Sequence, residues 1–317
     1  MKLYHNWTDF DSKIKYNVAI GSFDGIHLTH KKVLKSLTET SSEQNIKSCV
    51  ITFVPPPEKV LYNDINFKLL LSEDEKQLML EQLGIDALVV VPFNRWLADL
   101  NTCEFLESTI LKNIKINTLF FFNSDDFLSK MNTNIDELRN TAKKNHFKLI
   151  EIPDEKVNNT IVKSADIKDC INLGNIPDAN KLLSYDYFIS GTVVKGNQLG
   201  RKMGFPTANI KIDNNDKLIP KIGVYACYLC VNDEFYKCMT NIGYRPTIDE
   251  HHLTIETNIF DFDEDIYGRN VRLFFVKHLR DEIRFKNIEA LIEQLHADKQ
   301  NSKDVLDKVS LSLFPNC

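Results

Sequence analysis

Long apolar runs are absent from this sequence of 317 residues. The most apolar stretches, residues 87–93 and 119–122, are far too short to cross a bilayer as a helix. The amino terminus, MKLYHNW, has no apolar segment of the length that a secretory signal requires. The sequence therefore predicts a cytoplasmic protein without membrane-spanning segments.

An excess of basic residues is also absent. Lysine and arginine number 39 against 44 aspartates and glutamates, which gives a formal net charge of −5. Broad nucleic-acid binding normally needs a basic face, so the composition argues against it. A local basic pocket for one nucleotide is still compatible with this charge, because net charge does not describe a single cleft.

The first half of the chain alternates short apolar runs with amphipathic helical patterns, such as residues 30–40 and 73–83. The expected strands cover residues 17–20, 48–53, 87–91, 119–122 and 148–152. Nearly continuous apolar runs are typical of parallel strands that are buried on both faces. We therefore expect a Rossmann-like α/β domain with a parallel sheet over residues 1–183.

The second half, residues 184–317, changes to consecutive strand-like runs separated by turns. These runs cover residues 188–194, 207–212, 223–231, 234–240, 253–261 and 271–279. Several alternate polar and apolar residues, which favours a small six-stranded antiparallel barrel with one face inward. A final helix is expected from about residue 287.

Glycine is scarce, with 11 residues in the whole chain, yet four glycines fall within residues 191–204. Glycine allows backbone amides to approach phosphate closely. Pro206 then fixes the approach to Thr207 and Asn209, whose hydroxyl and amide oxygens suit Mg²⁺ or a phosphate oxygen. The residues of this candidate site are Gly191, Gly196, Gly200, Arg201, Gly204, Pro206, Thr207 and Asn209. From composition alone, a set of glycine-rich barrel turns is an equal alternative.

The run GTVVKGNQLGRKMGFPTANI, residues 191–210, resembles the ATP-binding motif of the bacterial riboflavin kinase domain. Further similarities follow in family order as IPKIGVY (219–225), NIGYRPT (241–247) and DFDEDIYG (261–268). The resemblance implies transfer of the γ-phosphate of ATP, with Mg²⁺, to the 5'-hydroxyl of riboflavin to make FMN. It implies that Thr207 and Asn209 bind the metal and ATP, and that the glycine-rich loop covers the phosphates.

The same resemblance implies that Glu256 is the general base. A primary alcohol is a poor nucleophile until a carboxylate takes its proton, so the chemistry requires such a group. Strand alternation places Glu256 and Asn258 on one face. Taken alone, a strand glutamate more often lies on a solvated face. Asn258 departs from the family, which often has histidine there. The riboflavin pocket is expected between the barrel and the final helix.

A second candidate site follows the first expected strand, where GSFDGIHLTH covers residues 21–30. A glycine turn between a strand end and a helix start is a good phosphate site in a parallel sheet. The run resembles the first motif of the FMN adenylyltransferase (FAD synthetase) domain, which bacteria commonly fuse ahead of riboflavin kinase. The resemblance implies a nucleotide site formed by Gly21, Phe23, Asp24, Gly25, His27, His30, Ser164 and Lys168.

Other adenylyltransferase motifs depart from the family pattern. Thr29 replaces a glycine, FVPPP at residues 53–57 lacks an aspartate and a histidine, residues 123–133 lack glycines and an arginine, and Lys168 replaces an arginine. Such losses remove groups that stabilise charge at the α-phosphorus. The sequence thus predicts a riboflavin kinase whose adenylyltransferase half is degraded and forms little FAD.

Three alternatives stay open. The chain could be a fully bifunctional enzyme, a flavin-binding regulator without turnover, or a kinase whose first half acts on another nucleotide or docks a partner. Riboflavin, FMN and ATP are the expected ligands, and the oligomeric state is open.

Overall fold

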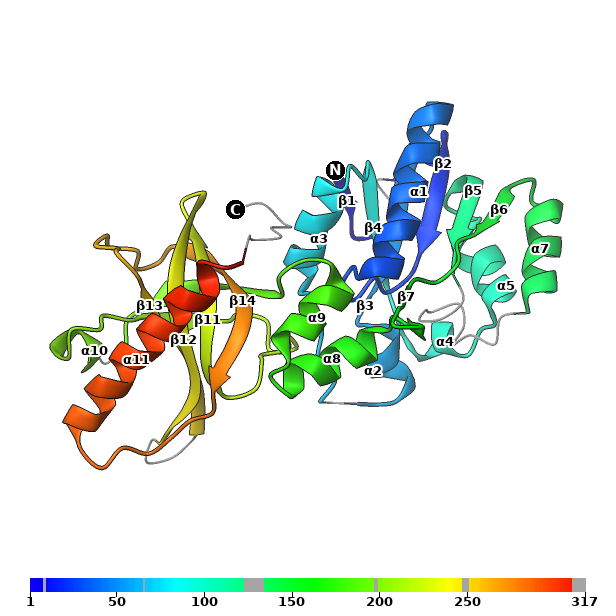
Figure 1. Ribbon diagram of the computed structural model, residues 1–317. Coiled ribbons are helices and arrows are strands. Elements are labelled where there is room, and N and C mark those ends of the chain that lie inside the picture. Colours follow the sequence, from blue (N-terminus) through cyan, green and yellow to red (C-terminus); the bar gives the residue numbers. More distant parts are fainter. Residues whose placement is uncertain (8–9, 65, 123–133, 197–198, 247–250, 310–317) are drawn as a thin grey trace. The chain divides into compact units, whose positions relative to one another are not determined.

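The computed structural model describes the chain except for residues 8–9, 65, 123–133, 197–198, 247–250 and 310–317 (Figure 1). The chain divides into two compact units, Met1–Ser164 and Ala165–Cys317. The proposed domain boundary after residue 183 stays a prediction. Among the described residues, no helix is long and apolar enough to cross a membrane. The cytoplasmic location and the lack of nucleic-acid binding stay predictions from composition.

The first unit contains a six-stranded sheet in which every neighbouring pair is parallel, as the sequence predicted. Its spatial order is β1-β4-β3-β2-β5-β6. The strands are β1 (Lys2–Tyr4), β2 (Lys15–Ile20), β3 (Lys47–Val54), β4 (Ala87–Pro92), β5 (Lys115–Phe121) and β6 (Lys148–Glu151). The central strand β2 is buried from Tyr16 to Ile20, which explains why its residues are apolar apart from Asn17.

Helices connect these strands, and one small hairpin follows β6. They are α1 (Leu28–Gln44), α2 (Pro57–Leu61), α3 (Glu73–Gln82), α4 (Arg95–Ala98), α5 (Thr102–Phe105), the π-helical turn η1 (Leu106–Ile110), α7 (Ile135–Lys144), and the hairpin β7 (Lys156–Val157) with β8 (Thr160–Ile161). Helix α3 begins with a capping box, in which the Ser72 and Glu75 side chains each bond the other residue's backbone N–H. Because α1 starts soon after β2 ends, the turn between them lies at the carboxyl edge of the sheet.

The second unit contains a closed antiparallel barrel, which confirms the predicted architecture. Its cyclic order is β10-β13-β12-β11-β14-β9, closed by pairing between β9 and β10. The strands are β9 (Phe188–Val194), β10 (Ala208–Lys211), β11 (Gly223–Val231), β12 (Glu234–Pro246), β13 (His251–Ile259) and β14 (Asn270–Arg280). The helices of this unit are α8 (Ser164–Asn172), α9 (Ile176–Leu183), α10 (Leu199–Lys202) and α11 (Ile288–Leu306).

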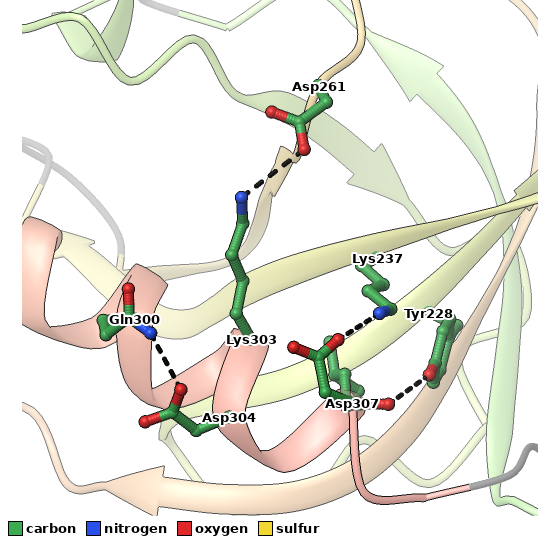
Figure 2. A network of polar contacts seen from close by, with 8 residues as sticks. Tyr228, Lys237, Asp261, Gln300, Lys303, Asp304 and Asp307 are labelled. Carbon is green, nitrogen blue, oxygen red and sulfur yellow. Dashed lines mark hydrogen bonds and ion pairs between the residues drawn. The ribbon is translucent and has the colours of Figure 1, made fainter.

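Polar contacts fasten the carboxyl end of α11 to the barrel (Figure 2). The Tyr228 hydroxyl on β11 donates to the carbonyl of Leu306 at 2.8 Å, and Lys237 on β12 forms an ion pair with Asp307. One turn earlier, Lys303 reaches Asp261 at 3.4 Å. This end of the helix is therefore held against β11 and β12, while its other end extends toward the cavity described below.

Candidate active sites

A cavity of about 570 Å³ lies in the second unit between the barrel and α11. Thr207, just before β10, and Glu256 on β13 contribute polar groups to its wall. Leu291 and Leu295 of α11 contribute apolar side chains. The cavity thus lies where the sequence placed the riboflavin pocket.

Glu256 lies beside Thr207 and Asn209, which were predicted to belong to the same site. The Thr207 hydroxyl donates to Oε2 of Glu256 at 3.4 Å, and Asn209 on β10 is the cross-strand partner of Glu256 on β13. Residues 49 positions apart in the sequence therefore meet because β10 and β13 are neighbours in the barrel.

Three of the four glycines of residues 191–204 allow the chain to approach itself closely. A Cβ on Gly191 would lie 2.5 Å from the Lys211 carbonyl, one on Gly196 would lie 2.3 Å from Nδ2 of Asn209, and one on Gly200 would lie 2.2 Å from the Phe205 carbonyl. Gly204 instead has open space but a φ of +79°, which favours glycine. In this structure these glycines lie close to β10 or to the residues that lead into it. A close approach of their backbone to phosphate stays a prediction. Arg201 lies on α10 with its side chain exposed.

Thr207, Asn209 and Glu256 suit Mg²⁺ in their chemistry, because hydroxyl, amide and carboxylate oxygens are hard donors. Among the described residues, no cluster of three or more His, Cys, Asp or Glu side chains could hold a metal. Mg²⁺ that binds together with a nucleotide usually takes a mixed set of protein oxygens and phosphate oxygens.

The second candidate site occupies the turn between β2 and α1. Phe23, Gly25 and Ile26 have positive φ angles of 48°, 85° and 39°, so the turn is tight. The Asp24 carboxylate accepts from the backbone N–H groups of Leu70 and Leu71 at 2.8 and 3.3 Å. These bonds tie the turn to the segment that precedes α3.

Ser164 and the two histidines converge on the same turn. The Ser164 hydroxyl donates to the Asp24 carbonyl at 3.0 Å. His27, the N-cap residue of α1, stacks on His30 with ring centroids 3.7 Å apart, and both side chains are fully buried. Both rings lie in or beside the first turn of α1, whose helix dipole favours anions. Lys168 lies on α8 and falls in the other compact unit.

Two features near this turn were not predicted. The Lys76 ammonium on α3 is buried and donates to the Ser22 carbonyl at 2.6 Å, with the Thr52 hydroxyl at 3.4 Å. Lys31 on α1 has a pKa lowered to about 8, because burial disfavours its charged form.

The departures from the adenylyltransferase motifs can be located only in part. Thr29 is buried, and its hydroxyl accepts from the backbone N–H of Glu155 at 3.1 Å, so this side chain fastens the segment before β7. Residues 123–133 lie outside the described residues.

Comparisons with known proteins agree for both halves. A riboflavin kinase family model matches residues 183–306, and an FAD synthetase model matches residues 10–166. Similar curated proteins include the bifunctional riboflavin kinase/FMN adenylyltransferases of Bacillus subtilis and Listeria monocytogenes. The former is 34% identical over 92% of this chain and 93% of its own length. The latter is 32% identical over 96% and 95%.

Among solved structures, a Streptococcus pneumoniae protein named a macrolide-efflux protein has a TM-score of 0.84 to this chain. The two sequences are 27% identical, and the likeness covers 95% of this chain and 98% of the other. Both compact units therefore have counterparts in one solved chain. With relatives above 30% identity along nearly the whole sequence, the chain belongs to the bifunctional riboflavin kinase/FMN adenylyltransferase family.

Proposed function

We propose that this chain catalyses both reactions of its family, phosphorylation of riboflavin to FMN and adenylylation of FMN to FAD. The similarity to relatives named for both activities, which extends along nearly the whole chain, carries this proposal. The expectation of a degraded adenylyltransferase half finds no support in these comparisons. The fully bifunctional alternative therefore replaces it as our reading.

In the kinase reaction, Glu256 accepts the proton of the riboflavin 5'-hydroxyl as that oxygen attacks the γ-phosphorus and ADP leaves. The 3.4 Å contact between Thr207 and Glu256 supports this role, because the hydroxyl that we propose binds phosphate is adjacent to the carboxylate that we propose as the base. Thr207 and Asn209 would hold Mg²⁺, which supplies charge neutralisation for the phosphates when bound. The glycine-rich segment and Arg201 would cover the nucleotide.

In the adenylyltransferase reaction, a phosphate oxygen of FMN attacks the α-phosphorus of ATP, and pyrophosphate leaves. His27 and His30 would donate hydrogen bonds to the triphosphate at the start of α1. The buried Lys76 ammonium supports activity in this half, because it is a fixed cation near the strand ends where other motif donors are missing.

Purified protein incubated with Mg-ATP and either riboflavin or FMN tests the proposal, with flavins separated by chromatography and pyrophosphate measured in parallel. We expect FMN from riboflavin, and FAD with pyrophosphate from FMN. Formation of FMN without FAD would instead favour a first half that lacks adenylyltransferase activity. Flavin binding without either product would favour a regulator without turnover.

A further inference from the structure

One buried acceptor in the kinase cavity has no partner among the described residues. Asn258 on β13 is 5% exposed and lines the cavity. Its Nδ2 donates to the Pro206 carbonyl at 2.7 Å, whereas its Oδ1 has no hydrogen-bond partner in the part of the chain that the structure describes.

The orientation of this amide is fixed by chemistry. A backbone carbonyl can only accept, so the nitrogen of Asn258 must face Pro206, and the oxygen must face the other way. Buried side-chain oxygens nearly always have a donor, and an unpaired one at a site calls for a ligand, water or ion. We therefore expect a ligand donor at Oδ1.

The position of Asn258 limits which ligand group this can be. Asn258 follows Glu256 by two residues, so both side chains leave the same face of β13 about 7 Å apart. The cross-strand neighbour of Asn258 is Met239, an apolar residue of the same cavity. Phosphate oxygens are acceptors and would be repelled by Oδ1. A hydroxyl close to the reacting one is the matching group.

We propose that Asn258 determines which flavin side chains the kinase accepts, because its Oδ1 accepts a hydrogen bond from a secondary hydroxyl of the ribityl chain. The proposal rests on the kinase function proposed above. With the terminal hydroxyl at Glu256, the next donors along the substrate are these secondary hydroxyls. A chain without them would leave the buried oxygen unpaired, and such sites reject the deficient substrate strongly.

Two substrates and two variants test the proposal. Riboflavin is compared with a flavin that carries a 5-hydroxypentyl chain, which keeps the terminal hydroxyl and lacks the secondary ones. We expect the wild-type protein to prefer riboflavin in kcat/KM by about tenfold to a hundredfold. Asn258→Leu should remove most of this preference. Asn258→Asp keeps an acceptor oxygen but loses the bond to Pro206, so it should turn over more slowly and retain the preference.

Thr254→Val is the matched control, because it removes a 3.2 Å bond from the same strand to the Gly243 carbonyl outside the cavity wall. The ratio of its kcat/KM values for the two flavins should equal that of the wild type. If Asn258→Leu does not fold, the wild-type preference and Asn258→Asp still decide the matter. Equal turnover of both flavins by the wild type, or an unchanged ratio in Asn258→Leu, overturns the inference and leaves the kinase intact. If Asn258→Leu raises KM for ATP and leaves the ratio of kcat/KM for the two flavins unchanged, the inference is also overturned. No phosphorylation of riboflavin by the wild type refutes the proposed function instead.

Discussion

Arg280, the last residue of β14, and Asp298, in the middle of α11, form a two-pronged ion pair in the cavity wall. Nε of Arg280 lies 3.0 and 3.1 Å from the two carboxylate oxygens, and Nη2 lies 2.7 Å from Oδ2. Gln294 adds a bond to Oδ1 at 2.9 Å. Asp298 is 1% exposed. The pair therefore joins the helix to the barrel beside the proposed flavin pocket.

Asp298→Asn should destabilise the second unit. The substitution leaves the Arg280 guanidinium partly buried without its counter-charge, which typically costs about 3–5 kcal/mol. Urea unfolding should show a lower midpoint with an unchanged slope. Asp213→Asn, which breaks the exposed 3.6 Å pair with Lys211, is the control and should change little. Equal stability of the two variants would contradict a structural role for the pair.

Glu256→Gln should stop the kinase and spare the adenylyltransferase. Glutamine keeps the shape and can still bond Thr207, but it cannot accept the substrate proton, so kcat should fall by about 10²–10⁴-fold. Formation of FAD from supplied FMN should be unchanged. Glu282→Gln, at another carboxylate of the same cavity wall, is the control. Comparable losses in the two variants would show that charge in the cavity matters rather than the base.

Burial on both faces made most of the first unit predictable. The five expected strands of that unit correspond to β2 through β6, of which β2 to β5 are largely buried. Strand β6, KLIE, has no fully buried residue. Strand β1 was missed because its three residues are half-exposed and form no pattern. In the barrel, β12 continues to Pro246, six residues beyond the expected end at 240. Its NIGYRP segment resembles a turn locally, yet pairing with β13 keeps it extended.

The residues of the candidate sites could be predicted only where they belong to a family motif. The Thr207 and Glu256 contact follows from motif positions, since nothing in their local sequence shows that β10 and β13 are neighbours. Lys76 gave no signal of its own, because a lysine in an amphipathic helix normally lies on the solvated face. Only the packing of α3 brings its ammonium beneath the Ser22 carbonyl.

His27→Ala should impair the adenylyltransferase and spare the kinase. Removing a donor that stabilises developing charge commonly costs about a hundredfold or more in rate. The test compares FAD formation from FMN with FMN formation from riboflavin in one preparation. His5→Ala changes an exposed histidine of the same unit and should leave both rates unaltered. Full FAD formation by His27→Ala would mean that other groups bind the triphosphate.

Lys31 should make stability depend on pH above neutrality. Its folded pKa of about 8 is below the ordinary value of 10.5, so between these values the unfolded chain binds more protons. Stability should therefore rise from pH 8 to 10.5 relative to Lys31→Met, by at most about 3 kcal/mol. Below pH 8 the difference between the two proteins should be constant. A constant difference over the whole range, measured by urea unfolding, would mean an ordinary pKa.

Gly200→Ala should damage ATP use more than Gly204→Ala does. At residue 200 a methyl group would lie 2.2 Å from the Phe205 carbonyl, which is backbone and can yield only by moving the segment that leads to Thr207. At residue 204 the methyl meets open space, and only the φ of +79° is strained, which costs about 1 kcal/mol of stability. We expect kcat/KM for ATP in the kinase reaction to fall at least about tenfold for Gly200→Ala and far less for Gly204→Ala. Equal losses of kcat/KM in the two variants would mean that the backbone torsions of the whole segment matter. The expected difference would mean that the contact between Gly200 and Phe205 matters, because it sets the position of Thr207.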